Sequence, residues 1–382
     1  MSTIKSRFRS LLSSMLVPLL SIVLTLLVAS VLVLLLGKNP LEVFMGFLRG
    51  SGLAIKPRYG GGQGLLTDLF SYLAVLTPMI FGSLGVMTGL RAGLFNIGVA
   101  GQMLFPAFMA TVLVGYSDLP SAIAWPLVIL IGIVLGSAMG AFIGFLKHRF
   151  NIHEVVTSII LNYIISYITG FFINTYYADP MTRNSRPINE ASRLIISTST
   201  GEGADLVRFH IPVGLILAVV VVFLMRFILD RTTIGFRVNA VGLNKYSARY
   251  AGINVGRTVV LAMALSGALA GLAGVTYYLG FTNNIVPKQL AGLGYDSIAV
   301  AVLGNITPVG SFFASILVTI FQKGSIYMGS NVGVPQEIAS VITGILLMFA
   351  ASGDYINMKI QNTRRRWQAR KGQNPDLEVM EE

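Results

Sequence analysis

The 382-residue chain has no cysteine, so no disulfide, thiolate metal site or cysteine nucleophile can form. Histidine is scarce too, with three residues. His148 and His153 are five positions apart, which does not place both side chains on one face of a helix. These two histidines are too few and too poorly placed to form a zinc site, so we expect no bound metal.

Sequence motifs of common enzyme active sites are missing as well. The chain has no HExxH, GxSxG, GxGxxG or GxxxxGK(S/T) pattern. These patterns mark zinc hydrolases, nucleophile elbows, dinucleotide sites and nucleotide hydrolysis. We therefore expect no enzyme activity and no cofactor bound by this chain. Without a nucleotide-binding motif, the chain also cannot drive transport with ATP by itself.

Charged residues make up only 12% of the chain, against 54% hydrophobic residues. Several uncharged runs reach about 20 residues, the length that crosses a hydrocarbon core of about 30 Å. This pattern predicts an all-α, polytopic helical membrane protein. The longest polar stretches, 37–67 and 178–210, are too short to form a soluble core. We expect one transmembrane domain over residues 1–352 and a cytoplasmic tail over residues 353–382.

The basic excess, a net charge of +12, is compatible with nucleic acid or with membrane lipid as a partner. In membrane proteins it usually lies in cytoplasmic loops that face anionic lipid. Ten crossings with both termini cytoplasmic place 18 of the 28 Lys and Arg residues inside. Nine crossings would put the arginine-rich C-terminal tail outside, against the positive-inside rule. We therefore expect about ten transmembrane segments, membrane lipid as a partner and no nucleic acid.

The predicted membrane segments differ in length. They cover residues 10–37, 71–90, 94–114, 121–146, 155–177, 211–229, 258–281, 294–304, 310–328 and 336–352. The segment 294–304 is only about half a span at the usual helical rise. We expect a short or broken helix there, packed inside the protein, where irregular backbone is tolerated.

Glycine is abundant, with 41 residues, and several of them recur at helical spacing. Two such rows are Gly132, Gly136, Gly140 and Gly144, and Gly267, Gly271 and Gly274. Small residues in these rows let membrane helices approach closely, so we expect them at helix contacts. Two other glycine-rich stretches, 93–103 and 292–305, weakly resemble each other. Paired interruptions of this kind occur where the substrate path of a transporter runs.

Ionisable residues within the apolar runs are few, which gives little support to a proton relay. Neutral amides and phenols are more common there, and they suit a path for an uncharged polar solute. The candidates for the substrate path are Asn96, Gln102, Asn162, Tyr163 and Asp296. Hydrogen bonds between helices and aromatic belts at the membrane surface are the alternative explanation for such residues.

A charged segment, residues 230–257, lies between two apolar runs. Within it, Asn244 is a candidate helix N-cap. Leu243, Tyr246 and Tyr250 fall on one face of the predicted helix. Gly242 and Gly252 would end the helix on either side. This pattern predicts a short, two-faced helix suited to docking, whereas an ordinary basic loop would need the charge but not the pattern.

Three ordered motifs resemble a known family. They are GLRAGLFNIGVAGQM at 89–103, TIGFRVNAVGLNKYSARYAGINV at 233–255 and GYDSIAVAVLGNITPVGSFFAS at 294–315. They are similar to the permease subunit of bacterial ABC importers in the branched-chain amino acid and ribose group, and most to the nucleoside (guanosine-type) permeases. Those permeases commonly carry a glutamate where this chain has Ala100. A role of that glutamate cannot be transferred to this chain.

The resemblance implies a bacterial plasma-membrane protein that passes a small polar solute, with nucleosides as the first expectation. It also implies ATPase subunits that use ATP and Mg, a second permease of homologous type and an extracytoplasmic solute-binding lipoprotein. Segment 230–257 would then be a cytoplasmic coupling loop that docks on the ATPase. The residues expected to couple are Gly235, Arg237, Gly242, Asn244, Tyr246, Arg249, Tyr250 and Gly252. A permease for ribose or another simple sugar, and an ion-coupled secondary carrier, are the alternatives.

Overall fold

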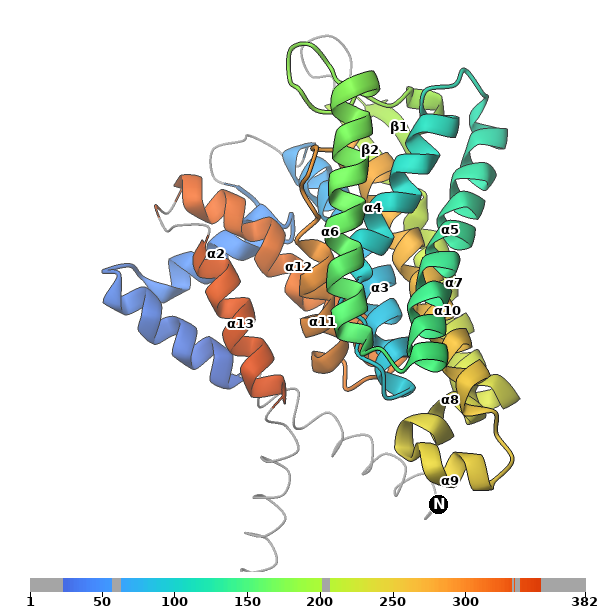
Figure 1. Cartoon of the computed structure of the whole chain (residues 1–382). Helices are drawn as coiled ribbons and strands as arrows, with labels where there is room; N and C mark the ends of the chain where they lie inside the picture. Colours follow the sequence, from blue (N-terminus) through green and yellow to red (C-terminus); the bar gives the residue numbers. More distant parts are fainter. Residues whose placement is uncertain (1–22, 57–62, 201–206, 332, 334–336, 352–382) are drawn as a thin grey trace, which may run out of the picture. The chain divides into compact units, whose positions relative to one another are not determined.

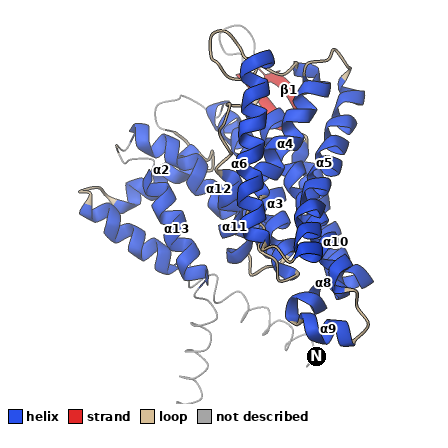
Figure 2. Ribbon diagram, in the orientation of Figure 1, coloured by secondary structure: helices blue, strands red, loops and turns tan. Residues whose placement is uncertain are grey.

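A computed structural model describes residues 23–56, 63–200, 207–331, 333 and 337–351. Helices dominate these residues (Figures 1 and 2), so the all-α class is confirmed. The chain divides into two compact units, residues 1–40 with 341–382, and residues 41–340. In the first unit, a helix covers Val23–Leu35. The boundary at residues 340 and 341 falls within α13 (Glu337–Ala351). The expected start of the first span and the tail 353–382 lie outside the described residues.

Five helices in the described part of the chain are long and apolar enough to cross a membrane. They are 64–91, 121–150, 154–177, 255–282 and 308–331, with a sixth if Val23–Leu35 and α2 (Pro40–Gly50) form one span. Their α-helical parts are α3 (Gln63–Arg91), α5 (Ser121–Phe150), α6 (Glu154–Phe172), α10 (Val255–Thr276) and α12 (Pro308–Asn331). The multi-pass character is confirmed, whereas the count of ten crossings stays a prediction.

The two glycine rows pack α5 against α10, as expected. A Cβ added at Gly136 would come within 3.0 Å of the Gly271 backbone, and one at Gly267 within 2.9 Å of the Gly140 backbone. The two helices therefore touch backbone to backbone, which larger side chains would prevent. Gly274 is the exception, because it faces the Met103 backbone of α4 (Val99–Ala110) instead.

The expected span 94–114 is wrong as a continuous helix. Residues 92–98 are not helical, and α4 begins only at Val99. A π-helical turn, Thr111–Gly115, continues it. The break starts at Gly93, whose φ of +70° is a conformation that favours glycine. Hydropathy missed the break because its residues are mostly apolar.

The expected short helix near residue 300 is present as α11 (Leu293–Leu303). It lies against α4, since a Cβ on Gly294 would be 2.7 Å from the Ala100 Cα. The two glycine-rich stretches that resemble each other in sequence therefore meet in space. Both introduce short apolar helices inside the bundle.

One small sheet adds to the helical fold. Strands β1 (Ile195–Thr200) and β2 (Val207–Pro212) pair antiparallel, with Ile195 opposite Pro212 and Thr200 opposite Val207. Because β2 includes residues 211 and 212, helix α7 (Gly214–Arg231) begins three residues later than the expected 211. The Trp125 indole nitrogen of α5 donates to the Arg193 carbonyl, 2.8 Å away, just before β1.

Candidate functional site

Segment 230–257 forms two helices, α8 (Thr233–Leu243) and α9 (Lys245–Tyr250). Asn244 separates them with an extended backbone, and its side-chain oxygen accepts the N–H groups of Tyr246 and Ser247 at 2.9 and 3.1 Å. The predicted N-cap is thus confirmed. Gly252, with φ +78°, follows the end of α9. These local signals fix a short helix where propensity alone would leave a loop.

The predicted apolar face of α9 is exposed. Leu243 is 88% exposed, Tyr246 65% and Tyr250 96%. Ala248 and Val241 point the other way and are buried. Tyr246 and Tyr250 on the capped helix, with Leu243 at the end of α8 just before the cap, form a surface suited to a protein partner.

Gly242 does not break a helix, so that expectation is wrong. It lies inside α8, one residue before its end. A Cβ there would collide with the Arg91 carbonyl oxygen at the end of α3. Gly235 is likewise buried against the carbonyl groups of Ile228 and Leu229 in α7. Both glycines therefore let α8 lie directly on the neighbouring backbone.

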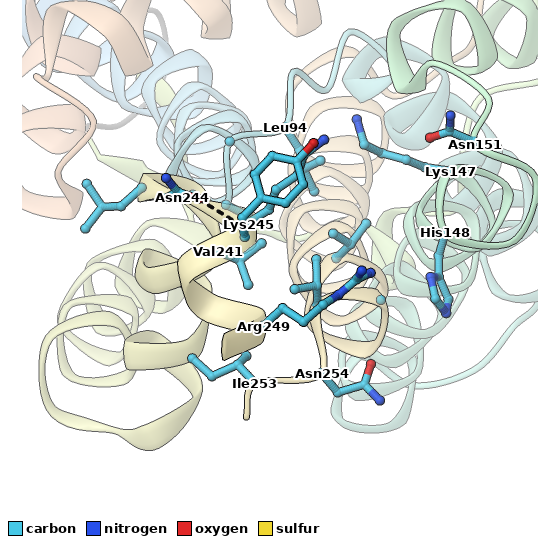
Figure 3. Close-up of a pocket in the computed structure, with 18 residues that line it drawn as sticks. Leu94, Lys147, His148, Asn151, Val241, Asn244, Lys245, Arg249, Ile253 and Asn254 are labelled. Carbon is cyan, nitrogen blue, oxygen red and sulfur yellow. Dashed lines mark hydrogen bonds between the residues drawn. The ribbon is translucent and has the colours of Figure 1, made fainter. Parts of the chain in front are cut away.

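A cavity of about 780 Å³ opens beside α9 (Figure 3). Its walls come from α8 and α9, the end of α5, the loop 92–94 and the start of α10. Lys147, His148, Lys245 and Arg249 line it, and none of its lining residues is acidic. Glu154 pairs with Lys147 from α6, so Lys245 and Arg249 provide most of the positive charge. The cavity would favour an acidic surface.

Two of the amides proposed for the substrate path are buried and bonded to each other. The Asn96 amide nitrogen donates to the Gln102 side-chain oxygen at 2.9 Å and to the Ser266 hydroxyl at 2.9 Å. Ser266 in turn donates to the Gly85 carbonyl at 2.6 Å. This cluster joins the broken segment to α10 and α3. A buried network with every member satisfied fixes one arrangement of the backbone.

Asn162 of α6 holds the same broken segment from the other side. Its side-chain oxygen accepts the Gly101 N–H at 2.9 Å, and its nitrogen donates to the Ile97 carbonyl at 3.1 Å. Glu154, the first residue of the same helix, accepts the Phe95 N–H at 3.4 Å. These side chains replace the hydrogen bonds that the non-helical backbone lacks. A role of Asn96, Gln102 and Asn162 in the substrate path stays a prediction.

The other two path candidates differ from the amides. Tyr163 is 62% exposed on α6, next to exposed Tyr167 one turn later. Asp296 of α11 accepts a hydrogen bond from Gln322 of α12. Tyr295 of α11, which the sequence analysis did not single out, is also exposed.

These features define a class: a multi-pass membrane protein with broken helices and a short capped helix with an exposed face, which are features of a transporter. The family described as the permease component of the branched-chain amino acid transport system matches residues 69–351. The chain belongs to this family of ABC transporter permeases. No solved structure matches it.

Several proteins are similar to the chain over most of its length. The nucleoside ABC transporter permease protein NupB of Lactococcus lactis is 34% identical over 88% of this chain and 90% of its own. The guanosine ABC transporter permease protein NupP of Bacillus subtilis is 34% identical over 89% of this chain and 94% of its own. The glucose ABC transporter permease protein TsgB13 of Haloferax volcanii is 26% identical over 76% of this chain and 78% of its own.

Proposed function

We propose that this chain is the permease subunit of an ATP-driven importer that passes nucleosides from a binding lipoprotein to the cytoplasm. Support comes from two relatives at 34% identity whose names specify nucleosides or guanosine. The chain has no nucleotide-binding motif, so separate ATPase subunits would bind ATP and Mg. The proposed second permease is a homologue of this chain.

The exposed face of α9 and the basic cavity beside it are the proposed ATPase contact. The face offers Leu243, Tyr246 and Tyr250, and the cavity offers Lys245 and Arg249. Aromatic anchors next to a complementary charged site are typical of protein interfaces. This docking assigns a role to a segment that is too polar to cross the membrane.

The tyrosines of α6 are the proposed start of the solute path. At 1.5 Å per residue, Tyr163 and Tyr167 lie about 13 and 20 Å along the 24-residue helix that starts at Glu154. That is the middle of a core about 30 Å thick, whereas lipid-facing tyrosines gather at its surfaces. Exposed phenols at that depth fit a water-filled path shared with the second permease. Their rings can stack on nucleobases.

Transport by the purified importer tests this function. The chain, its second permease, the ATPase and the lipoprotein would be reconstituted in liposomes, and uptake of labelled guanosine measured with and without ATP. We expect uptake only with ATP and the complete set of subunits. Guanosine uptake driven by an ion gradient through this chain alone would contradict the proposal and support a secondary carrier.

A simple sugar is the second candidate solute, because the glucose permease is among the relatives. Competition in the same liposomes separates the two. We expect unlabelled adenosine or inosine to reduce guanosine uptake, and glucose or ribose to leave it unchanged. ATP-driven uptake of labelled ribose or glucose without guanosine uptake would favour the sugar.

A further inference from the structure

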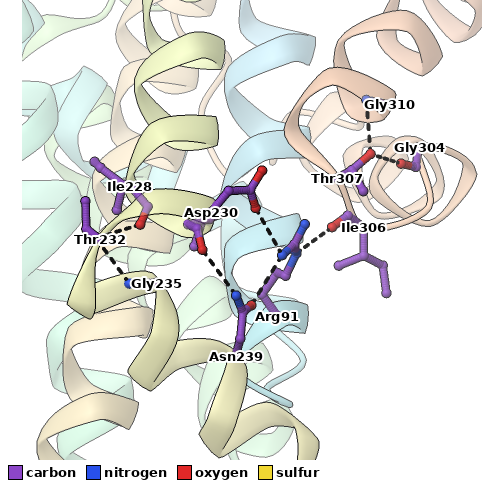
Figure 4. A network of polar contacts seen from close by, with 11 residues as sticks. Arg91, Ile228, Asp230, Thr232, Gly235, Asn239, Gly304, Ile306, Thr307 and Gly310 are labelled. Atoms are coloured by element: carbon purple, nitrogen blue, oxygen red, sulfur yellow. Dashed lines mark hydrogen bonds and ion pairs between the residues drawn. The ribbon is translucent and has the colours of Figure 1, made fainter. Parts of the chain in front are cut away.

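Arg91, the last residue of α3, joins four parts of the bundle through one guanidinium group. Its Nε donates to the Ile306 carbonyl at 2.8 Å, and its Nη1 donates to the Asn239 side chain of α8 at 3.3 Å. The same Nη1 lies 3.7 Å from the Asp230 carboxylate at the end of α7. Figure 4 shows Asp230 of α7, Asn239 of α8 and Ile306 in the turn after α11 converging on Arg91.

The contact between Arg91 and α8 is stiff. Asn239 also donates to the Leu229 carbonyl of α7 at 3.2 Å, which fixes its amide. Gly242 of α8 lies so close to Arg91 that a Cβ would collide with the Arg91 carbonyl. With backbone against backbone there, α8 cannot shift without pushing on the end of α3.

The turn on the other side of Arg91 is also stiff. Ile306 has φ +52°, which is unusual for a β-branched residue and needs support from its surroundings. The Thr307 hydroxyl donates to the Gly304 carbonyl at 2.8 Å and accepts the Gly310 N–H at 3.2 Å. These bonds tie the end of α11 to the start of α12, so a force on Ile306 would move both helices.

Helix α11 leads from this turn to the proposed solute path. Gly294 lies on Ala100 of α4, and the next residue, Gly101, donates its N–H to Asn162 of α6 at 2.9 Å, beside Tyr163. A small shift of α11 would therefore reach both the broken segment and the exposed tyrosines. Packed elements pass such shifts on as units because they have little free volume.

We propose that Arg91 is a positioning residue that ties α8 to the α11–α12 turn, so that movement of α8 and α9 reaches the solute path. This inference rests on the proposed function, since the ATPase would supply the movement. Arginine suits the role because its fork presents donors in two directions, here toward a carbonyl and toward an amide and a carboxylate. A lysine has one ammonium group and cannot hold both sides in the same geometry.

Arg91→Gln in the complete importer tests the link. We expect the variant to assemble with the ATPase and hydrolyse ATP within about twofold of wild type, while guanosine moved per ATP falls about tenfold or more, the effect of losing a hydrogen bond to a charged group. Arg226→Gln, an exposed arginine of α7 outside the network, should keep the wild-type ratio. An unchanged ratio in Arg91→Gln, or a parallel loss of hydrolysis and uptake, would refute the proposal.

A second variant guards against misfolding of the first. Asn239→Ala removes the side-chain bond from Arg91 to α8, together with the bond from Asn239 to the Leu229 carbonyl, and leaves the bond from Arg91 to Ile306. If Arg91→Gln does not assemble, a fall in guanosine per ATP in Asn239→Ala supports the link, and an unchanged ratio overturns it.

A distance measurement separates this inference from the identity of the solute. Because the chain has no cysteine, spin labels at Ile234→Cys on α8 and Phe313→Cys on α12 are specific. We expect their distance to stay constant between ATP-free and ATP-bound importer, and to change with ATP once Arg91 is replaced. If ATP changed the distance between the two labels as much in the otherwise wild-type importer as in the Arg91→Gln importer, the proposed link through Arg91 would be refuted. Failure of the proposed solute alone would appear as ATP hydrolysis without guanosine uptake.

Discussion

Tyr163 shows how exposure separates path candidates that look alike in sequence. Asn96 and Gln102 are buried and bonded to each other, whereas the Tyr163 ring is free to meet a solute. Tyr163→Ala should reduce guanosine uptake about tenfold, because stacking on an aromatic ring contributes about 1–3 kcal/mol per base. Tyr163→Phe should keep most of the uptake. The measurement is the initial rate of uptake in liposomes at subsaturating guanosine.

Tyr176 provides the matched control for this prediction. It is an exposed tyrosine at the C-terminal end of the same span, where an aromatic belt is expected, whereas Tyr163 lies in the middle. Tyr176→Ala should leave uptake unchanged. Equal losses in both variants would show that the tyrosines serve membrane anchoring instead of the solute.

Ala100 is a second position where one side chain decides the packing. Ala100 is fully buried, and a Cβ added at Gly294 would lie 2.8 Å from the Ala100 Cβ. Ala100→Glu would place a carboxylate where α4 and α11 touch, and we expect it to lower the free energy of unfolding by on the order of 3 kcal/mol. The readout is the melting temperature of the purified chain, with Ala100→Ser as the small control.

An unchanged melting temperature in Ala100→Glu would contradict this packing argument. It would mean that α11 can move away from α4 at little cost. The glutamate of related permeases would then be compatible with this fold, and its absence here would need another explanation.

At the scale of the element, α9 combines a local and a tertiary requirement. The Asn244 cap makes the helix, and its exposed face is the proposed contact with the ATPase. Tyr246→Ala with Tyr250→Ala should weaken ATPase binding by about 2 kcal/mol or more, since aromatic anchors dominate interfaces. Affinity for the ATPase in detergent is the measurement. Met181→Ala, which is 94% exposed in the loop after α6, should bind as wild type does.

Membrane insertion must be checked beside that affinity. The double variant should appear in the membrane at the wild-type level, because neither ring packs inside the bundle. Wild-type affinity in the double variant would remove α9 from the ATPase contact and leave segment 230–257 as a basic loop.

The elements that sequence predicted best are those with local causes. Long apolar runs gave α5, α6, α10 and α12, and an amide before a polar helix gave the cap at Asn244. The glycine-rich stretch 93–103 indicated an interruption, but hydropathy alone drew the span 94–114 across it because hydropathy does not register backbone conformation. Arg91 was missed because its partner Ile306 is 215 residues away. Some polar side chains bond to the backbone of a neighbouring segment, and others are exposed and could line a solute path. Contacts between distant parts of the chain decide which of the two a given side chain does.

At the scale of the whole molecule, the number of crossings depends most on α7. It has 18 residues, long enough for a span, but it carries three charged residues, Arg226, Asp230 and Arg231, and is not among the helices apolar enough to cross a membrane. If α7 crosses, the loop after α6 and the helix α9 lie on opposite sides of the membrane. If it does not, α9 lies outside the cell, where no ATPase can reach it.

Single cysteines decide between these arrangements, because the wild-type chain gives no background labelling. Met181→Cys should react with an impermeant maleimide in intact cells, and Ser247→Cys only after the membrane is opened. Both side chains are exposed in this chain, and Ser247→Cys is labelled in cells that lack the ATPase, so the membrane limits the reaction. Labelling of Ser247→Cys in intact cells would contradict the docking of α9 on an ATPase and, with it, the transfer of movement through Arg91.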